Sequence, residues 1–184
     1  MNPKDALQRL IDGNSRFVSG QTTSHNAAID RATMSEGQAP FAAVLRCADS
    51  RVSPEIVFDQ PLGNLFVCAV AGNVPTPEIV ESLEYAVGQL SCPLIVVMGH
   101  TNCGAVAHAT THLPTKGLFS MVDIPHDDED AIAFNAEQGI PKIMASSDMI
   151  QEAVKIGQVQ IIAGVYDIGS GQFELVAQTT VESA

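Results

Sequence analysis

The chain has 184 residues and an acidic balance, with 9 Lys and Arg against 21 Asp and Glu and a formal net charge of −12. This length is typical of one domain with a substantial core, and we expect that domain to span residues 1–184. The apolar content of 46% argues against disorder, and the surplus of negative charge disfavours nucleic acid and anionic membranes as partners. No apolar run reaches the ~18 residues of a membrane span, and the first residues lack the layout of a signal peptide, so we expect a cytoplasmic protein.

The first forty residues predict a helical arm followed by a long loop. Apolar residues recur at helical spacing over residues 2–18, where Gly13 weakens the middle, so we expect one helix or two short ones. Residues 19–40 are rich in Gly, Ser, Thr and Asn and show little periodicity. Because so long a loop is unusual in a compact domain, we expect it to pack on another part of the protein, either in its own chain or in another subunit.

Apolar segments of strand length then alternate with helical patterns. We expect strands at 41–46, 65–70, 94–98, 160–166 and 173–177. We expect helices from Thr76, from Gly104 and over residues 143–157, with an irregular segment at 112–132. This alternation predicts an α/β fold with a mostly parallel central sheet of four to five strands, flanked by helices and closed by an antiparallel end strand.

Two groups of reactive side chains stand at the ends of predicted strands. Cys47 follows the first strand, and His100 and Cys103 follow the third. Open α/β sheets place their sites at the carboxyl ends of strands, and two thiolates with an imidazole are three good zinc ligands that leave a fourth position free. These ligands converge only if the two strands are neighbours. Cys68 and Cys92 are expected in the core.

Asp49 and Arg51 lie two residues apart and can reach the same side of the chain. They form either an ordinary surface ion pair or part of the site. Beside a zinc ion, the carboxylate of Asp49 would orient the metal-bound water, while Arg51 would keep Asp49 ionised and away from the metal. If the pair broke, Asp49 could take the fourth position and close the site.

Two sequence motifs suggest a family. Cys47-Ala-Asp-Ser-Arg51 and Gly99-His-Thr-Asn-Cys-Gly-Ala-Val106 resemble the two signatures of the β-class carbonic anhydrases. The resemblance continues through residues 14–17, 58–60, 71–73, 82–86 and 164–167. It implies one Zn²⁺ per chain on Cys47, His100 and Cys103, an Asp49–Arg51 dyad, and a homodimer or dimer of dimers whose N-terminal helices embrace the neighbouring subunit.

The resemblance also implies a substrate pocket. Gln38 is expected to donate a hydrogen bond to substrate, Gly104 to present a backbone amide, and Phe66 and Tyr85 to line the pocket across the subunit boundary. Without the resemblance, Gln38 would be interpreted as an exposed loop residue, Phe66 as a core residue and Tyr85 as a helix-face residue. The chain has Ala69 where many members carry an arginine, and it has no tryptophan. Members regulated by bicarbonate at a non-catalytic site use that pair, so we expect the open form of the zinc site.

These observations predict reversible hydration of CO₂ to bicarbonate by hydroxide held on zinc and aligned by Asp49. Gln38 and the Gly104 amide would stabilise the charge that develops on oxygen. His108 and His112 are candidates for a proton relay, but either can equally be an ordinary surface histidine.

Three other functions remain open at this stage. A hydrolase acting on CS₂ or carbonyl sulfide would share the same zinc ligands. A non-catalytic zinc-binding protein would keep Asp49 permanently on the metal. A thiol hydrolase would use Cys47 with His100, and its activity would survive removal of zinc.

Overall fold

The computed structural model describes residues 1–25, 31, 34–112, 115–125 and 130–180. Its centre is a five-stranded sheet with the order β2-β1-β3-β4-β5, in which β5 alone is antiparallel to its neighbour. The strands are β1 (Ala42–Arg46), β2 (Leu65–Ala69), β3 (Leu94–His100), β4 (Gln160–Tyr166) and β5 (Phe173–Gln178). The predicted α/β architecture is confirmed, including the antiparallel strand at the end of the sheet.

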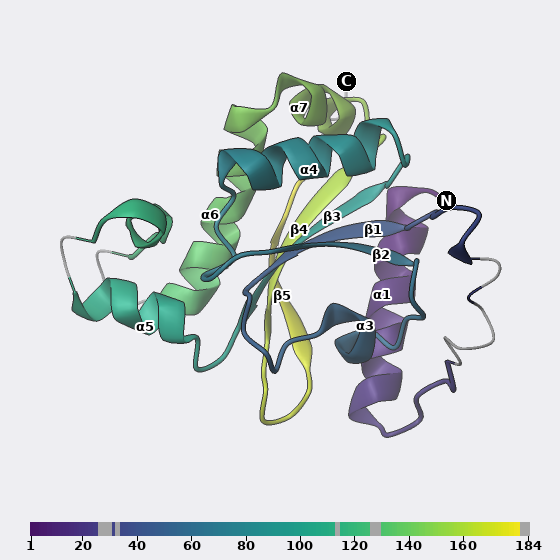
Figure 1. Cartoon of the computed structure of the whole chain (residues 1–184), viewed down its shortest axis with the longest axis horizontal. Coiled ribbons are helices and arrows are strands. Elements are labelled where there is room, and N and C mark those ends of the chain that lie inside the picture. Colours follow the sequence, from purple (N-terminus) through teal and green to yellow (C-terminus); the bar gives the residue numbers. More distant parts are fainter. Residues whose placement is uncertain (26–30, 32–33, 113–114, 126–129, 181–184) are drawn as a thin grey trace.

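Helices cover both faces of the sheet (Figure 1). One face carries α1 (Pro3–Val18) and α3 (Pro54–Val57), and the other carries α4 (Pro77–Gly88), α6 (Ala131–Ser146) and α7 (Asp148–Lys155). The helix α5 (Gly104–Thr111) and the 3₁₀ helix η1 (Gly117–Met121) follow the carboxyl end of β3. Within the described ranges, no helix is long and apolar enough to cross a membrane.

The N-terminal segment forms one unbroken helix. Asn2 caps α1 by accepting a hydrogen bond from the Asp5 N–H at 2.8 Å. Leu10 is fully buried against the sheet of its own chain. The helix continues through Gly13. A glycine is needed there because a Cβ atom at this position would lie 1.9 Å from the carbonyl oxygen of Phe58. At least part of the predicted arm therefore belongs to the core of its own chain.

The predicted helix over residues 143–157 and the predicted irregular segment before it are both partly wrong. Asp130 caps a helix that already begins at Ala131, and its Oδ1 accepts a hydrogen bond from the Ile132 N–H at 2.9 Å. Ser147 then separates α6 from α7 and caps the latter through the Ile150 N–H. The part of the predicted acidic loop at 126–129 lies outside the described residues. Strand β3 is also longer than expected, because its last residue, His100, still pairs with Tyr166.

Candidate metal centre

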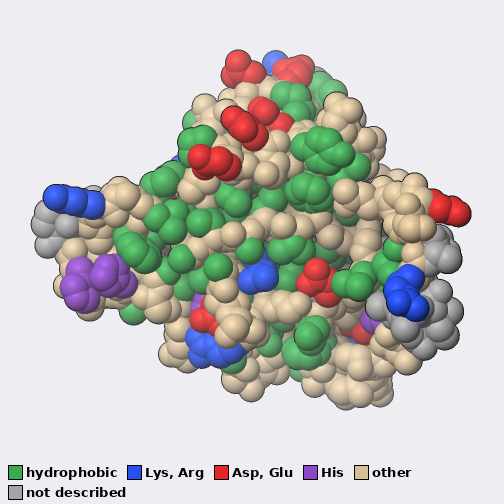
Figure 2. Space-filling model, viewed as in Figure 1, with side chains coloured by type: hydrophobic (Ala, Val, Ile, Leu, Met, Phe, Trp, Pro, Cys, Tyr) green, Lys and Arg blue, Asp and Glu red, His purple; other side chains and the backbone are tan. Residues whose placement is uncertain are grey.

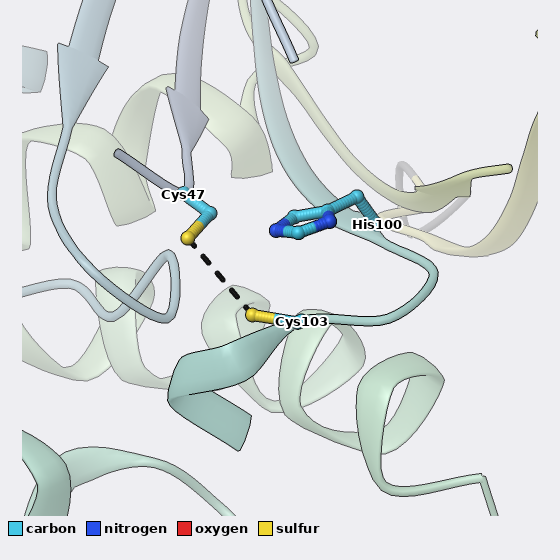
Figure 3. Close-up of side chains that lie close together, drawn as sticks. All are labelled: Cys47, His100 and Cys103. Carbon is cyan, nitrogen blue, oxygen red and sulfur yellow. Dashed lines mark hydrogen bonds between the residues drawn. The ribbon is translucent and has the colours of Figure 1, made fainter. Parts of the chain in front are cut away.

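The three predicted ligands converge at the carboxyl ends of the parallel strands β1 and β3. Cys47 directly follows β1, His100 ends β3 and Cys103 stands immediately before α5. The ligand atoms of all three residues lie within 4.8 Å of one another, and the two sulfur atoms are 3.9 Å apart (Figure 3). They meet because β1 and β3 are adjacent parallel strands. The condition that the sequence analysis placed on this site is therefore fulfilled.

His100 is oriented as a metal-ligating imidazole. The residue is fully buried, and its Nδ1 lies 3.0 Å from the Thr101 carbonyl oxygen. If Nδ1 carries the proton, it donates to this carbonyl and leaves Nε2 with a free lone pair. Nε2 is buried and has no hydrogen-bond partner, although buried polar atoms in folded proteins nearly always have one. The donor set and this unpartnered nitrogen both fit a bound metal ion.

The four cysteines divide into two electrostatic classes. The Cys103 thiol donates to the sulfur of Cys47, and the Gly72 N–H donates to it at 3.3 Å, so the pKa of Cys47 falls to about 4 despite burial. The same pairing raises the pKa of Cys103. Burial raises the pKa of Cys68 to about 11 and that of Cys92 to about 12. Cys68 and Cys92 are core thiols, as predicted, whereas Cys47 readily provides the thiolate that a metal requires.

Asp49 lies beside the ligand cluster and is held by Arg51. Arg51 Nε donates to Asp49 Oδ1 at 2.9 Å, and Nη2 donates to Oδ2 at 2.7 Å. These hydrogen bonds hold the pKa of the Asp49 carboxyl well below its usual range. The nearest ligand atom recorded for Asp49 is His100 Nε2, 3.9 Å from Oδ2. Asp49 Oδ2 is therefore bonded to Arg51 and lies beyond hydrogen-bond distance of His100.

The predicted pocket residues divide into one that joins the metal centre and three that do not. Gly104 is the first residue of α5 and lines a cavity of about 450 Å³ together with Cys103. Phe66 and Tyr85 contact each other, with ring centroids 6.1 Å apart, and Gln38 is an exposed residue before β1. Among the described residues, no hydrogen bond, ion pair or ring contact connects these three side chains with the metal ligands.

The sequence analysis missed three residues that support the turn carrying Cys47. Arg46 Nη1 donates to the Cys47 carbonyl at 2.6 Å, Gly72 donates to the Cys47 sulfur, and Asn135 Nδ2 donates to the Gly72 carbonyl at 2.9 Å. The sequence could have indicated Arg46, because a charged residue at the end of an apolar strand needs a polar partner. It could also have indicated Gly72, because the family resemblance includes residues 71–73. No local signal pointed to Asn135, because the start of α6 was not predicted.

An apolar wall surrounds the sulfur atoms. Val74, Val106 and Val122 are buried in one cluster with Cys47 and Cys103. Burial in this wall strengthens electrostatic interactions near the ligands, since the local dielectric is lower than that of water. A mostly parallel sheet whose strand ends hold a Cys-His-Cys cluster beside an Asp–Arg pair defines an α/β protein with a candidate metal centre.

Comparison with known proteins identifies the family. The carbonic anhydrase family profile matches residues 42–123. Carbonic anhydrase 2 of Mycobacterium tuberculosis is 34% identical over 93% of this chain and 91% of its own length. The carbonic anhydrase of Mycolicibacterium smegmatis is 35% identical over 95% of this chain and 93% of its own. The chain therefore belongs to the β-class carbonic anhydrase family and is a carbonate dehydratase, a lyase.

Solved structures agree with this assignment. A Coccomyxa β-carbonic anhydrase in complex with acetazolamide is 26% identical, with a TM-score of 0.70 over 95% of this chain and 88% of that one. A tetrameric β-carbonic anhydrase from Sordaria macrospora has a TM-score of 0.71 over 96% of this chain and 100% of that one, at 22% identity. The second likeness concerns the fold alone.

Proposed function

We propose that this protein hydrates CO₂ reversibly to bicarbonate with one Zn²⁺ per chain, held by Cys47, His100 and Cys103. The observation that carries the proposal is the convergence of these three ligand atoms within 4.8 Å of one another. Two thiolates and one imidazole form a donor set suited to Zn²⁺, and three protein ligands leave one position for the reaction. When bound, zinc supplies the Lewis acidity that makes hydroxide available near neutral pH.

We propose that Asp49 and Arg51 act as a dyad. The ionised carboxylate of Asp49 accepts a hydrogen bond from the attacking water and directs its lone pair toward the carbon of CO₂. Arg51 binds both carboxylate oxygens, so it keeps Asp49 charged and away from the three ligands. An Asp49 released from Arg51 would be free to compete for the metal.

Substrate is proposed to bind beside α5. The Gly104 N–H stands at the N-terminus of that helix, where backbone amides carry partial positive charge. In this proposal, Gly104 and Gln38 donate hydrogen bonds to the oxygen atoms on which charge develops. Phe66 and Tyr85 form the apolar side of the substrate pocket, against which the neutral CO₂ binds.

We propose that a second copy of the chain completes this pocket. The large apolar side chains Ile56, Leu62 and Tyr85 are 62%, 55% and 49% exposed. Figure 2 shows hydrophobic side chains spread across the face that carries α4 and the edge strand β2. An exposed apolar surface of this kind is typical of a protein–protein interface. A homodimer formed here, with the exposed part of the N-terminal arm packing on the partner, would bring Phe66 and Tyr85 to the subunit boundary. The cytoplasmic location stays a prediction.

Zinc content and the rate of CO₂ hydration test the proposed function. We expect one zinc per chain and hydration activity across about pH 6.5–9, the range around a zinc-water pKa near neutrality. A chelator should abolish the activity and added Zn²⁺ should restore it. Turnover of CS₂ or carbonyl sulfide without CO₂ hydration would overturn the substrate assignment, and activity that survives zinc removal would indicate thiol chemistry at Cys47.

A further inference from the structure

A buried asparagine on α6 reaches the backbone beside the metal ligands. Asn135 is 3% exposed. Its Nδ2 donates to the Gly72 carbonyl at 2.9 Å, and its Oδ1 accepts from the Asp123 N–H at 3.0 Å. Two hydrogen bonds to the backbone of two different segments fix the orientation of this side-chain amide, and the bond to Gly72 is buried away from competing water.

Gly72 transmits this contact to the site. Its φ of +80° lies in the region that favours glycine, and a Cβ atom here would lie 3.1 Å from Val122 Cγ2. The Gly72 N–H donates to Cys47 Sγ at 3.3 Å. The N–H and the carbonyl of Gly72 lie in two rigid peptide planes that are joined only through its φ and ψ. Holding the carbonyl limits the values that φ and ψ can take together, and so limits the directions in which the N–H can point.

Helix α6, which carries Asn135, also holds the segment whose Val122 packs with Cys47 and Cys103. Further along α6, Lys142 Nζ lies 2.5 Å from Asp123 Oδ2 and donates to the Met121 carbonyl at 2.8 Å. Between these two attachments stands Val122, which packs in the same apolar cluster as Cys47 and Cys103. Helix α6 therefore holds both the Gly72 backbone and the segment above the ligands.

We infer that Asn135 is a positioning residue of the metal centre: by holding the Gly72 carbonyl, it keeps the Gly72 N–H directed at the sulfur of Cys47 and so raises the affinity of the site for zinc. In the part of the chain that the structure describes, no hydrogen bond or ion pair joins Asn135 to a ligand. A hydrogen bond to a ligand orients that ligand, and losing such a partner typically weakens metal binding about 10–100-fold. The inference rests on the proposed zinc function and adds to it a residue that is distant in sequence.

The chain contains a matched control in Asn14. This residue is 5% exposed, its Nδ2 donates to the carbonyls of Val57 and Gly171, and its Oδ1 accepts from the Phe173 N–H at 2.9 Å. It performs the same chemistry as Asn135 but packs among α1, α3 and β5, and none of its bonds leads to a ligand. A general loss of stability should therefore appear in both variants, whereas loss of zinc affinity should appear in one.

The experiment compares Asn135→Ala with Asn14→Ala in the full-length protein. The zinc dissociation constant is measured by competition with a chromophoric chelator. We expect it to rise about 10–100-fold in Asn135→Ala and to stay within about twofold of wild type in Asn14→Ala. In the cadmium-substituted proteins, scalar coupling between the metal nucleus and the Gly72 amide proton reports the N–H···S hydrogen bond directly. We expect this coupling in the wild type and in Asn14→Ala and its loss in Asn135→Ala.

Three results would overturn the inference: unchanged zinc affinity in Asn135→Ala, equal weakening in both variants, or weakened affinity with the Gly72 coupling intact. Asn135→Leu, which fills the site without introducing charge, serves if the alanine variant does not fold. If neither variant folds, absence of the coupling in the wild type overturns the inference and its presence supports it. A wild type that binds no zinc would instead refute the proposed function, so the two failures are distinguishable.

Discussion

Arg51 holds the carboxylate of Asp49 at two points, with Nε 2.9 Å from Oδ1 and Nη2 2.7 Å from Oδ2. The Arg51 N–H adds a third hydrogen bond to Oδ1 at 3.0 Å. A planar guanidinium matches the geometry of a carboxylate, so this contact specifies direction as well as charge. Because the Arg51 side chain is 49% exposed, solvent screens the attraction, and we assign the pair mainly to positioning, with a small contribution to stability.

Replacing Arg51 by lysine should therefore impair catalysis although the charge is kept. The ammonium group of lysine cannot form the two parallel bonds, so we expect kcat/KM for CO₂ hydration to fall about 10–100-fold, as for other supporting residues of metal sites. Stopped-flow hydration assays measure this. Lys155→Ala is the control, since Lys155 is 73% exposed and its contact with Glu152 is 3.8 Å long. An Arg51→Lys enzyme with full activity would show that charge alone suffices.

The ionisation of Asp49 predicts how the pair responds to pH. The hydrogen bond from Arg51 lowers the pKa of Asp49 in the folded protein, below the value of about 3.9 in an unfolded chain. The stabilisation that results is present above the unfolded pKa and is lost as the pH falls through the folded pKa. At pH 5 the metal-free wild type should thus have a higher Tm than Asp49→Asn, and this difference should shrink progressively as the pH falls below about 4. A difference that stays the same from about pH 5 to about pH 2 would contradict the assignment.

The metal ligands were predictable from the sequence because they lie at or shortly after the ends of two strands. Each of these strands can be recognised from a short, continuous run of apolar residues. Cys47 and His100 needed only the further fact that β1 and β3 are neighbours. The start of α6 was not predictable in the same way. Gly139 and Pro141 look like helix breakers, but a Cβ at position 139 would lie 2.8 Å from Val97 Cγ1, so the contact with β3 requires glycine there.

The supporting contacts of the site depend on tertiary structure. Asn135 and Gly72 are 63 residues apart in the chain, and only the packed fold brings them into hydrogen-bond contact. For Gln38, Phe66 and Tyr85, the sequence predicts a role in the site that no contact in the described part of the single chain reproduces. The family resemblance predicts their roles, while the contacts of a single chain do not join them to the ligands.

The thiols of the metal-free protein should differ in reactivity. Hydrogen bonds from Cys103 and Gly72 lower the pKa of Cys47 to about 4, whereas burial raises those of Cys68 and Cys92 to about 11 and about 12. A thiolate is the nucleophile in alkylation, and all three thiols are buried, so iodoacetamide at neutral pH should modify Cys47 faster than Cys68 and Cys92. Peptide mass spectrometry identifies the sites. Zinc should protect Cys47, and equal labelling with and without zinc would argue against Cys47 as a ligand.

Gly13 should resist substitution although it lies within a helix. Alanine normally stabilises a helix relative to glycine by up to about 1 kcal/mol. Here the added Cβ would lie 1.9 Å from the Phe58 carbonyl oxygen, so we expect Gly13→Ala to lower the free energy of unfolding by about 1–3 kcal/mol. Urea denaturation measures it. Gly88→Ala is the control, since its Cβ would meet Met149 Cε at an ordinary 3.6 Å and should cost less than about 0.5 kcal/mol.

The proposed dimer can be tested at Tyr85, whose side chain is 49% exposed and contacts Phe66. An arginine there would bury a charge in an apolar interface, which costs far more than the contact contributes. We expect Tyr85→Arg to shift the protein toward a monomer in light scattering and to lower CO₂ hydration, with zinc content unchanged because the three ligands come from one chain. Met149→Arg, at a 40% exposed site on α7, is the matched control and should leave the assembly intact. A Tyr85→Arg protein that keeps the wild-type mass would place the interface elsewhere. A monomer with full activity would instead show that one chain forms the whole pocket.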